Sequence, residues 1–166
     1  NGLVFGSGSF GDKETELIRN TIGSWNPNHS NGSAVLGSYP DDSKTGYQEF
    51  KGPQVHQAAI RIGRRLFPQA HPDFDGLFVL NTILGGYFGS RLMMEIRENQ
   101  GLTYGIYSSV DSFAADGCFY ISTETATDNT SKVIEAIQQE MRKLQQELIP
   151  VEELDMARNY LMGHLM

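Results

Sequence analysis

The stretch ILGGYFGSRLMMEIRENQGLTYGI, residues 83–106, decides the fold because it links two helical patterns to a strand pattern. The first helix is predicted to start after its N-cap, Asp73. It is expected to end at Gly85-Gly86, because glycine adopts the left-handed backbone conformation of a helix end at the lowest energetic cost. A second, short helix is predicted over residues 90–99, and Gly101 ends it. A strand follows at once, so the end of a helix is expected beside the start of a strand.

Two strands and two further helices are predicted on the C-terminal side. Residues 102–111 and 117–125 alternate and are rich in Tyr, Ile, Val and Thr, which favours an antiparallel hairpin across the intervening SFAAD. Apolar spacing predicts helices over 131–148 and, after Pro150, over 151–166. The predicted apolar face of the first of these helices comprises Ile134, Ile137, Met141, Leu144 and Leu148.

The N-terminal side adds shorter patterns. A strand is predicted at Leu3–Phe5, followed by a helix over 12–25 with Asp12 as its N-cap. Residues 26–53 are rich in Asn, Ser, Gly, Asp and Pro and predict a long loop, and residues 54–63 predict a strand. Helices and neighbouring antiparallel strands without strict alternation indicate an α+β fold.

Composition narrows the class of protein. The chain has 166 residues, a net charge of -7 and one cysteine, Cys118. The length fits a single domain over 1–166, and the missing start Met and uncapped last helix predict a piece of a longer chain. One thiol excludes an internal disulfide framework and a thiolate zinc site. The acidic balance argues against nucleic acid, and no apolar run reaches the roughly 20 residues of a membrane span. The compartment is left open.

Other candidate chemistry has little support in the sequence. None of the four histidines has the spacing of a helical metal site, and the inverted zinc motif H-x-x-E-H is absent. The glycine-rich residues 85–90 lack the lysine of a phosphate loop, so a closely packed turn is the favoured interpretation. Cys118 lies in a predicted strand and is interpreted as a buried structural thiol. Glu95 and Glu98 are expected to pair with Arg91 or to stay solvated.

Arg97 and Tyr104 form the most specific candidate site. Arg97 falls in the last turn of the short helix, Tyr104 lies seven residues later in the next strand, and the break at Gly101 lets the strand fold back. A guanidinium and a phenol would then converge as donors for an oxyanion or a peptide carbonyl. From the pattern alone a structural alternative is favoured, in which Arg97 stabilises the helix C-terminus and Tyr104 is a half-buried strand aromatic.

The pattern I-L-G-G-x-x-x-S-R-L-x-x-x-I-R-E-x-x-G-L-T-Y-x-I over 83–106 resembles the insulinase and mitochondrial-processing-peptidase (pitrilysin-type) family of zinc metallopeptidases. Supporting positions are spread along essentially the whole chain, from Trp25 through Pro72-Asp73 to Glu153-Leu154. The resemblance implies an α+β domain whose mostly antiparallel sheet is covered on one face by helices. It also implies that homologous domains pair to enclose a chamber.

The resemblance further implies a division of roles between paired domains. One domain carries H-x-x-E-H and a distant Glu, while its partner lacks these ligands and supplies an Arg and a Tyr, seven residues apart, that bind the substrate carbonyl. This sequence matches the partner pattern, so Arg97 and Tyr104 are the expected substrate-binding residues. No catalytic residue and no metal ligand is expected in this chain. Zinc is expected in a homologous domain on the same polypeptide or a second subunit, and unfolded peptides are the expected substrates.

The expected function is therefore that of a metal-free, substrate-binding C-terminal domain of a zinc-dependent endopeptidase, inactive when isolated. It would also stabilise the substrate carbonyl in the transition state. One alternative is a non-catalytic scaffold of the same fold, in which the Arg–Tyr pair would be eroded, whereas both residues are present here. A second is a stand-alone module for peptides or nucleotides, although the lysine of a phosphate-binding loop is absent.

Overall fold

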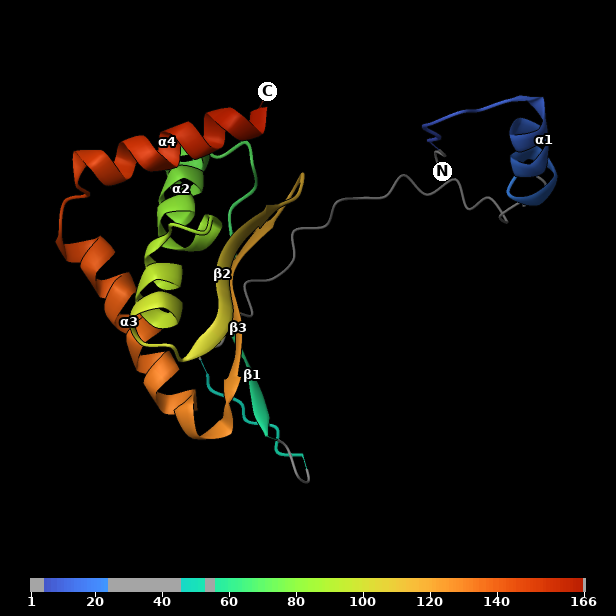
Figure 1. Cartoon of the computed structure of the whole chain (residues 1–166). Coiled ribbons are helices and arrows are strands. Elements are labelled where there is room, and N and C mark those ends of the chain that lie inside the picture. The colour runs from blue at the N-terminus through green and yellow to red at the C-terminus, as the bar shows by residue number, and fades with distance from the viewer. Residues whose placement is uncertain (1–4, 24–45, 53–55, 166) are drawn as a thin grey trace. The chain divides into compact units, whose positions relative to one another are not determined.

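The structure, a computed structural model, describes residues 5–23, 46–52 and 56–165 (Figure 1). Contacts within the chain divide it into two units, Asn1–Gly37 and Ser38–Met166. No helix in the described ranges is long and apolar enough to cross a membrane.

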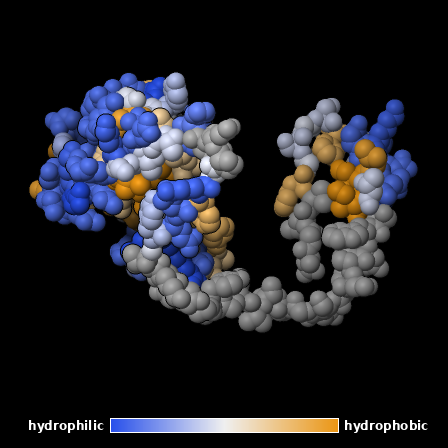
Figure 2. Space-filling model, turned by 90° about the horizontal axis from the view of Figure 1, so that it is seen from below, coloured by the Kyte–Doolittle hydropathy of each residue, from blue (hydrophilic) through white to orange (hydrophobic). Residues whose placement is uncertain are grey.

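The N-terminal unit contains helix α1, Asp12–Thr21. Asp12 is the first helical residue and not the N-cap, which corrects the prediction: the cap is Gly11, whose N–H donates to Glu14 Oε2 at 2.9 Å. The acidic side chains of Asp12 and Glu14 still lie in the first turn, at the positive end of the helix dipole. No residue of α1 is buried, and Figure 2 shows hydrophobic surface beside hydrophilic surface on this unit.

Several predicted N-terminal features lie outside the described residues. The predicted strand Leu3–Phe5 is described only at its last residue, which is in no strand. Trp25, at the predicted end of the helix, and most of the predicted loop 26–53 are outside. The described part of that loop, residues 46–52, forms no helix or strand.

The C-terminal unit is built on a three-stranded antiparallel sheet in the order β1-β3-β2. The strands are β1 (Gln57–Leu66), β2 (Thr103–Ser112) and β3 (Gly117–Ala126). β2 and β3 form the predicted hairpin, and β1 pairs with the other side of β3, with Ile62 opposite Ile121. β1 continues past the predicted end at residue 63 because its pairing with β3 continues.

Helices cover one face of this sheet, as the predicted α+β architecture requires (Figure 1). The segments η1 and η2 are π-helical, and η3 is a short 3-10 helix. The helical segments of this unit are, in chain order, α2 (Phe74–Asn81), η1 (Thr82–Gly86), η2 (Met93–Asn99), η3 (Thr127–Asn129), α3 (Thr130–Gln146) and α4 (Val151–Leu165).

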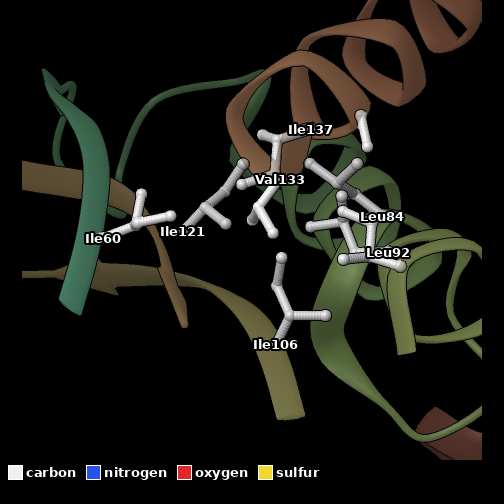
Figure 3. Close-up of a cluster of buried hydrophobic side chains, with 9 residues drawn as sticks. Ile60, Leu84, Leu92, Ile106, Ile121, Val133 and Ile137 are labelled. Carbon is white, nitrogen blue, oxygen red and sulfur yellow. The ribbon is translucent and has the colours of Figure 1, made fainter. Parts of the chain in front are cut away.

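The core lies between the sheet and its helical layer, where apolar side chains from the strands, from α3 and from the helical run of η1 and η2 meet (Figure 3). Each fully buried Ile or Leu contributes about 1.5–3 kcal/mol. The predicted apolar face of α3 is confirmed at Ile137, which is 0% exposed, and is wrong at Leu148, which is 96% exposed because α3 already ends at Gln146. The core side chains labelled in Figure 3 are Ile60, Leu84, Leu92, Ile106, Ile121, Val133 and Ile137.

Gly85-Gly86 ends the helical run as predicted, but for a different reason. Among the described glycines, positive φ occurs at Gly8 and Gly101, and not at this pair. A Cβ on Gly85 would lie 2.6 Å from both the backbone N and Oγ of Ser108. The missing side chain at this position therefore lets η1 approach β2 closely.

Candidate functional site

Arg97 lies in η2, which is anchored by two neighbours of the same helical run, Leu92 and Ile96, both 0% exposed. The segment ends at Gly101, which has a φ of 62° and donates its N–H to the Arg97 carbonyl at 3.1 Å. This left-handed termination turns the chain directly into β2. The prediction that a break at Gly101 folds the strand back beside the helix end is confirmed.

Tyr104 lies at a β-bulge near the start of β2. The pairing register shifts between Thr103 and Ile106, so Tyr104 and Gly105 together oppose one residue of β3, Glu124. A bulge leaves one residue out of the ladder and changes the direction of its side chain. Tyr104 is 93% exposed, so it is not the half-buried strand aromatic of the structural alternative.

Threonine hydroxyls stabilise the irregular main chain of the bulge. Thr103 Oγ1 donates to the Glu124 carbonyl at 2.6 Å, and Thr123 Oγ1 donates to the Gly105 carbonyl at 2.8 Å. Hydroxyl donors replace ladder hydrogen bonds that the bulge interrupts. The bulge is therefore a built feature, with carbonyls of both strands bonded at that point.

The Arg97 guanidinium contacts this bulge directly. Nε donates to the Tyr104 carbonyl at 2.9 Å, Nη1 forms an ion pair with Glu98, and Cζ lies 4.9 Å from the centroid of the Phe88 ring. The sequence prediction is met in part, because Arg97 reaches the main chain of Tyr104. Across the described ranges, no contact joins the guanidinium to the phenol of Tyr104.

The arrangement leaves hydrogen-bond donors available on both side chains. In the part of the chain that the structure describes, no group accepts a hydrogen bond from Arg97 Nη2, and none bonds to the Tyr104 hydroxyl. A guanidinium N–H and a phenol O–H both suit a carbonyl or carboxylate oxygen. The site can therefore offer donor groups to an oxygen ligand.

Two partners of Arg97, Phe88 and Glu98, were not predicted from the sequence. Glu98 is adjacent in sequence, but adjacent helical residues do not ordinarily face each other, so no spacing rule indicated the pair. Phe88 approaches Arg97 only through the turn between η1 and η2. The bulge did have a signal, since Gly105 interrupts a β-rich run and an isolated Gly in a strand pattern often marks a bulge.

Arg91 pairs with neither of the carboxylates that the sequence offered it. It forms a bidentate ion pair with Glu153 of α4, with both N–O distances 2.7 Å. Glu95 instead accepts hydrogen bonds from the side chains of Asn99 at 2.9 Å and Gln100 at 2.8 Å, which hold the pKa of Glu95 below its usual value. Both contacts fix the helical run that carries Arg97, one to α4 and one at its own end.

Among the residues that the structure describes, the remaining titratable candidates do not assemble a metal centre. Within the described ranges no group of three or more His, Cys, Asp or Glu side chains is placed to hold a metal. His56 and His164 are exposed, and His29 lies outside the described residues. The ring of His71 stacks on that of Phe67, with the ring centroids 3.9 Å apart.

The other two sequence candidates have packing roles. The turn at 85–90 is closely packed, since a Cβ at Gly89 would lie 2.8 Å from the Tyr87 ring, in agreement with the favoured interpretation of a packed turn. Cys118 lies in β3 and is only partly buried, so the interpretation as a buried thiol holds in part.

Comparison with known proteins places the chain among peptidase relatives. Residues 4–161 match the family model described as the peptidase M16 inactive domain. A crystal structure of a peptidase M16 inactive domain from Pseudomonas fluorescens is 32% identical with a TM-score of 0.63, and the match covers 66% of this chain and 27% of that chain.

Two curated relatives carry different names. The uncharacterized zinc protease YmxG of Bacillus subtilis is 31% identical over 113 residues, which are 68% of this chain and 28% of that protein. The non-peptidase homolog YmxG of Helicobacter pylori is 33% identical over 90 residues, which are 51% of this chain and 20% of that protein. The chain thus spans about a quarter of the length of the curated relatives it matches.

Proposed function

This chain belongs to the family of peptidase M16 inactive domains, and from that premise we propose that it is the metal-free, substrate-binding half of a zinc-dependent endopeptidase. In this proposal Arg97 and Tyr104 contact the main-chain carbonyl of an unfolded peptide near the scissile bond. The observation that carries the proposal is the Arg97 guanidinium, which is fixed by the Tyr104 carbonyl at 2.9 Å with Nη2 left for a ligand.

The chemistry of these two side chains suits peptide hydrolysis. Negative charge develops on the carbonyl oxygen as a tetrahedral intermediate forms, and fixed donors stabilise it more than they stabilise the neutral substrate. Arg97 Nη2 and the Tyr104 hydroxyl would donate to that oxygen. Neither side chain needs to change its protonation state, because both act only as donors.

The proposal requires a partner that supplies the metal. This sequence lacks H-x-x-E-H, and no cluster of metal-ligating side chains is found in its described part. Zinc held by a homologous domain, in the same polypeptide or in a second subunit, would supply activated water. Residues 1–166 are then one domain of a longer peptidase or of a complex, without peptidase activity of their own and without a role in binding nucleic acid.

A second candidate function is a non-catalytic scaffold or peptide-binding relative of the family. The observation in its favour is that the Helicobacter pylori relative is named a non-peptidase homolog. Such a protein would keep the sheet and helices, whereas selection would not act on a carbonyl-binding arginine. Activity measurements separate the two candidates.

The first experiment measures peptidase activity and zinc content for this chain alone, for a homologous zinc-bearing domain alone, and for their mixture. Activity in the mixture only, with zinc only on the partner, supports the proposal. Zinc-dependent cleavage by this chain alone would contradict it. Folded, zinc-loaded protein without activity in any sample would favour the scaffold.

The second experiment tests the assigned pair in the active mixture. Arg97→Ala and Tyr104→Phe are each expected to lower kcat by about 10²–10³, the usual effect of removing one oxyanion donor. Zinc content is expected to stay unchanged because neither residue is a ligand. Wild-type turnover in both variants would refute the assignment.

A further inference from the structure

Phe88 is an exposed aromatic residue with a specific neighbour. Its side chain is 63% exposed, yet its ring centroid lies 4.9 Å from Arg97 Cζ, within the range of a cation–π contact. We propose that Phe88 is a positioning residue that holds the Arg97 guanidinium in the orientation that binds substrate. The inference rests on the proposed function and names a residue outside the Arg97–Tyr104 pair.

The turn that carries Phe88 is held by contacts of its neighbouring residues. Tyr87 stacks on Tyr160 of α4 with ring centroids 5.0 Å apart, and its carbonyl accepts a hydrogen bond from the Ser90 N–H at 3.1 Å. Gly89 cannot carry a side chain without contacting the Tyr87 ring at 2.8 Å. The residue before Phe88 is thus anchored to α4 and the residue after it must be small, so the position of Phe88 is set by its neighbours.

A ring contact can hold the Arg97 guanidinium without occupying a further N–H group, which another polar partner would do. A free arginine side chain has many rotamers, and fixing one of them on binding costs conformational entropy. The Tyr104 carbonyl and Glu98 already engage Nε and Nη1. An aromatic ring attracts the cation without acting as a conventional hydrogen-bond acceptor, so the Phe88 contact fixes the guanidinium and leaves Nη2 available.

The test uses this whole chain and a fluorescein-labelled, basic, unstructured peptide, with binding measured by fluorescence anisotropy. Arg97→Ala makes the net charge of the chain more negative, so non-specific attraction of a basic peptide would rise. A loss of binding in this variant would therefore report the specific contact made by Arg97. Phe88→Leu is the test variant and Phe88→Trp the conservative one. Phe113→Leu is the matched control, because Phe113 is 62% exposed in the β2–β3 turn.

We expect Arg97→Ala to weaken peptide binding about tenfold or more. Phe88→Leu should weaken peptide binding about two- to fivefold. Phe88→Trp should bind the peptide as the wild type does, since Trp gives the strongest cation–π contact. Phe113→Leu should bind as wild type. In the NMR spectrum the Arg97 side-chain signals should lose their ring-current shift in Phe88→Leu and keep it in Phe113→Leu.

The outcomes separate this inference from the proposed function. If Arg97→Ala weakens binding while Phe88→Leu binds like wild type, the positioning role is overturned and the proposed function stands. A wild-type chain that binds no peptide, or an Arg97→Ala variant that binds equally well, overturns both. Equal losses in Phe88→Leu and Phe113→Leu would mean general destabilisation and would also overturn the positioning role.

Discussion

Replacing Gly85 with alanine tests the close approach of η1 to β2. The added Cβ would lie 2.6 Å from the backbone N and Oγ of Ser108 and 3.0 Å from its Cβ. Ser108 is 4% exposed, and its Oγ donates to the Asn81 carbonyl at 3.2 Å, so it has no room to withdraw. The clash must be relieved by moving main chain of η1 or β2.

Overpacking of this kind costs about 1–3 kcal/mol. For a chain of this size that cost corresponds to a fall in Tm of roughly 2–12 °C. The adjacent Gly86 is a matched control, because its added Cβ would meet the Asn81 carbonyl oxygen and Thr82 Cβ at 3.4 Å. Gly86→Ala should therefore change the free energy of unfolding by less than about 1 kcal/mol in either direction.

The assay is urea unfolding of the two variants and the wild type, followed by circular dichroism, with thermal melts as a second measurement. A midpoint that falls in Gly85→Ala at an unchanged m value would show a loss of stability without a change in the surface exposed on unfolding. A Gly85→Ala variant within about 0.5 kcal/mol of wild type, or equal losses in both variants, would refute the packing argument.

Two further predictions concern α3 and the hairpin turn. Ile137→Ala should lower the free energy of unfolding by about 2–5 kcal/mol, whereas Leu148→Ala, at a side chain 96% exposed, should change it by less than about 0.5 kcal/mol in the same urea assay. A hydrogen bond from Arg65 and, to a smaller extent, one from the Gly117 N–H lower the pKa of the Asp116 carboxyl group. The ionised carboxylate therefore stabilises the fold at pH values above the unfolded pKa of about 4, and this stabilisation is lost as pH falls through the lower folded pKa. The difference in stability between wild type and Asp116→Asn should therefore shrink in acid, and a pH-independent difference would contradict the assignment.

Much of the C-terminal unit could be predicted from local patterns. The β2–β3 hairpin follows from alternation and a short polar connection, and α4 follows from a helical pattern restarted after Pro150. The left-handed end of η2 follows from Gly101. These features depend on neighbours in the sequence, and so the sequence contains the information that determines them.

Features that depend on distant contacts could not be predicted. The partner of Arg91 is Glu153, 62 residues away, and local spacing offered only nearer carboxylates. A side chain at Gly85 would clash with Ser108 of β2, which lies far away in the sequence. Local rules indicate only a left-handed helix end for such a glycine, and the structure shows none at this position. The exposed position of Leu148 depends on where α3 stops, and helix ends are the least determined part of an apolar pattern.

The seven-residue separation of Arg97 and Tyr104 is itself set by three local features in succession. The π-helical segment places Arg97 near its end, Gly101 turns the chain toward β2, and the carbonyl of Tyr104, at the bulge, accepts from Nε. In a regular strand start Tyr104 alone would oppose Glu124, whereas here it shares that position with Gly105. The motif therefore specifies more than two side chains at a distance: it specifies the main-chain path that makes one of them hold the other in place.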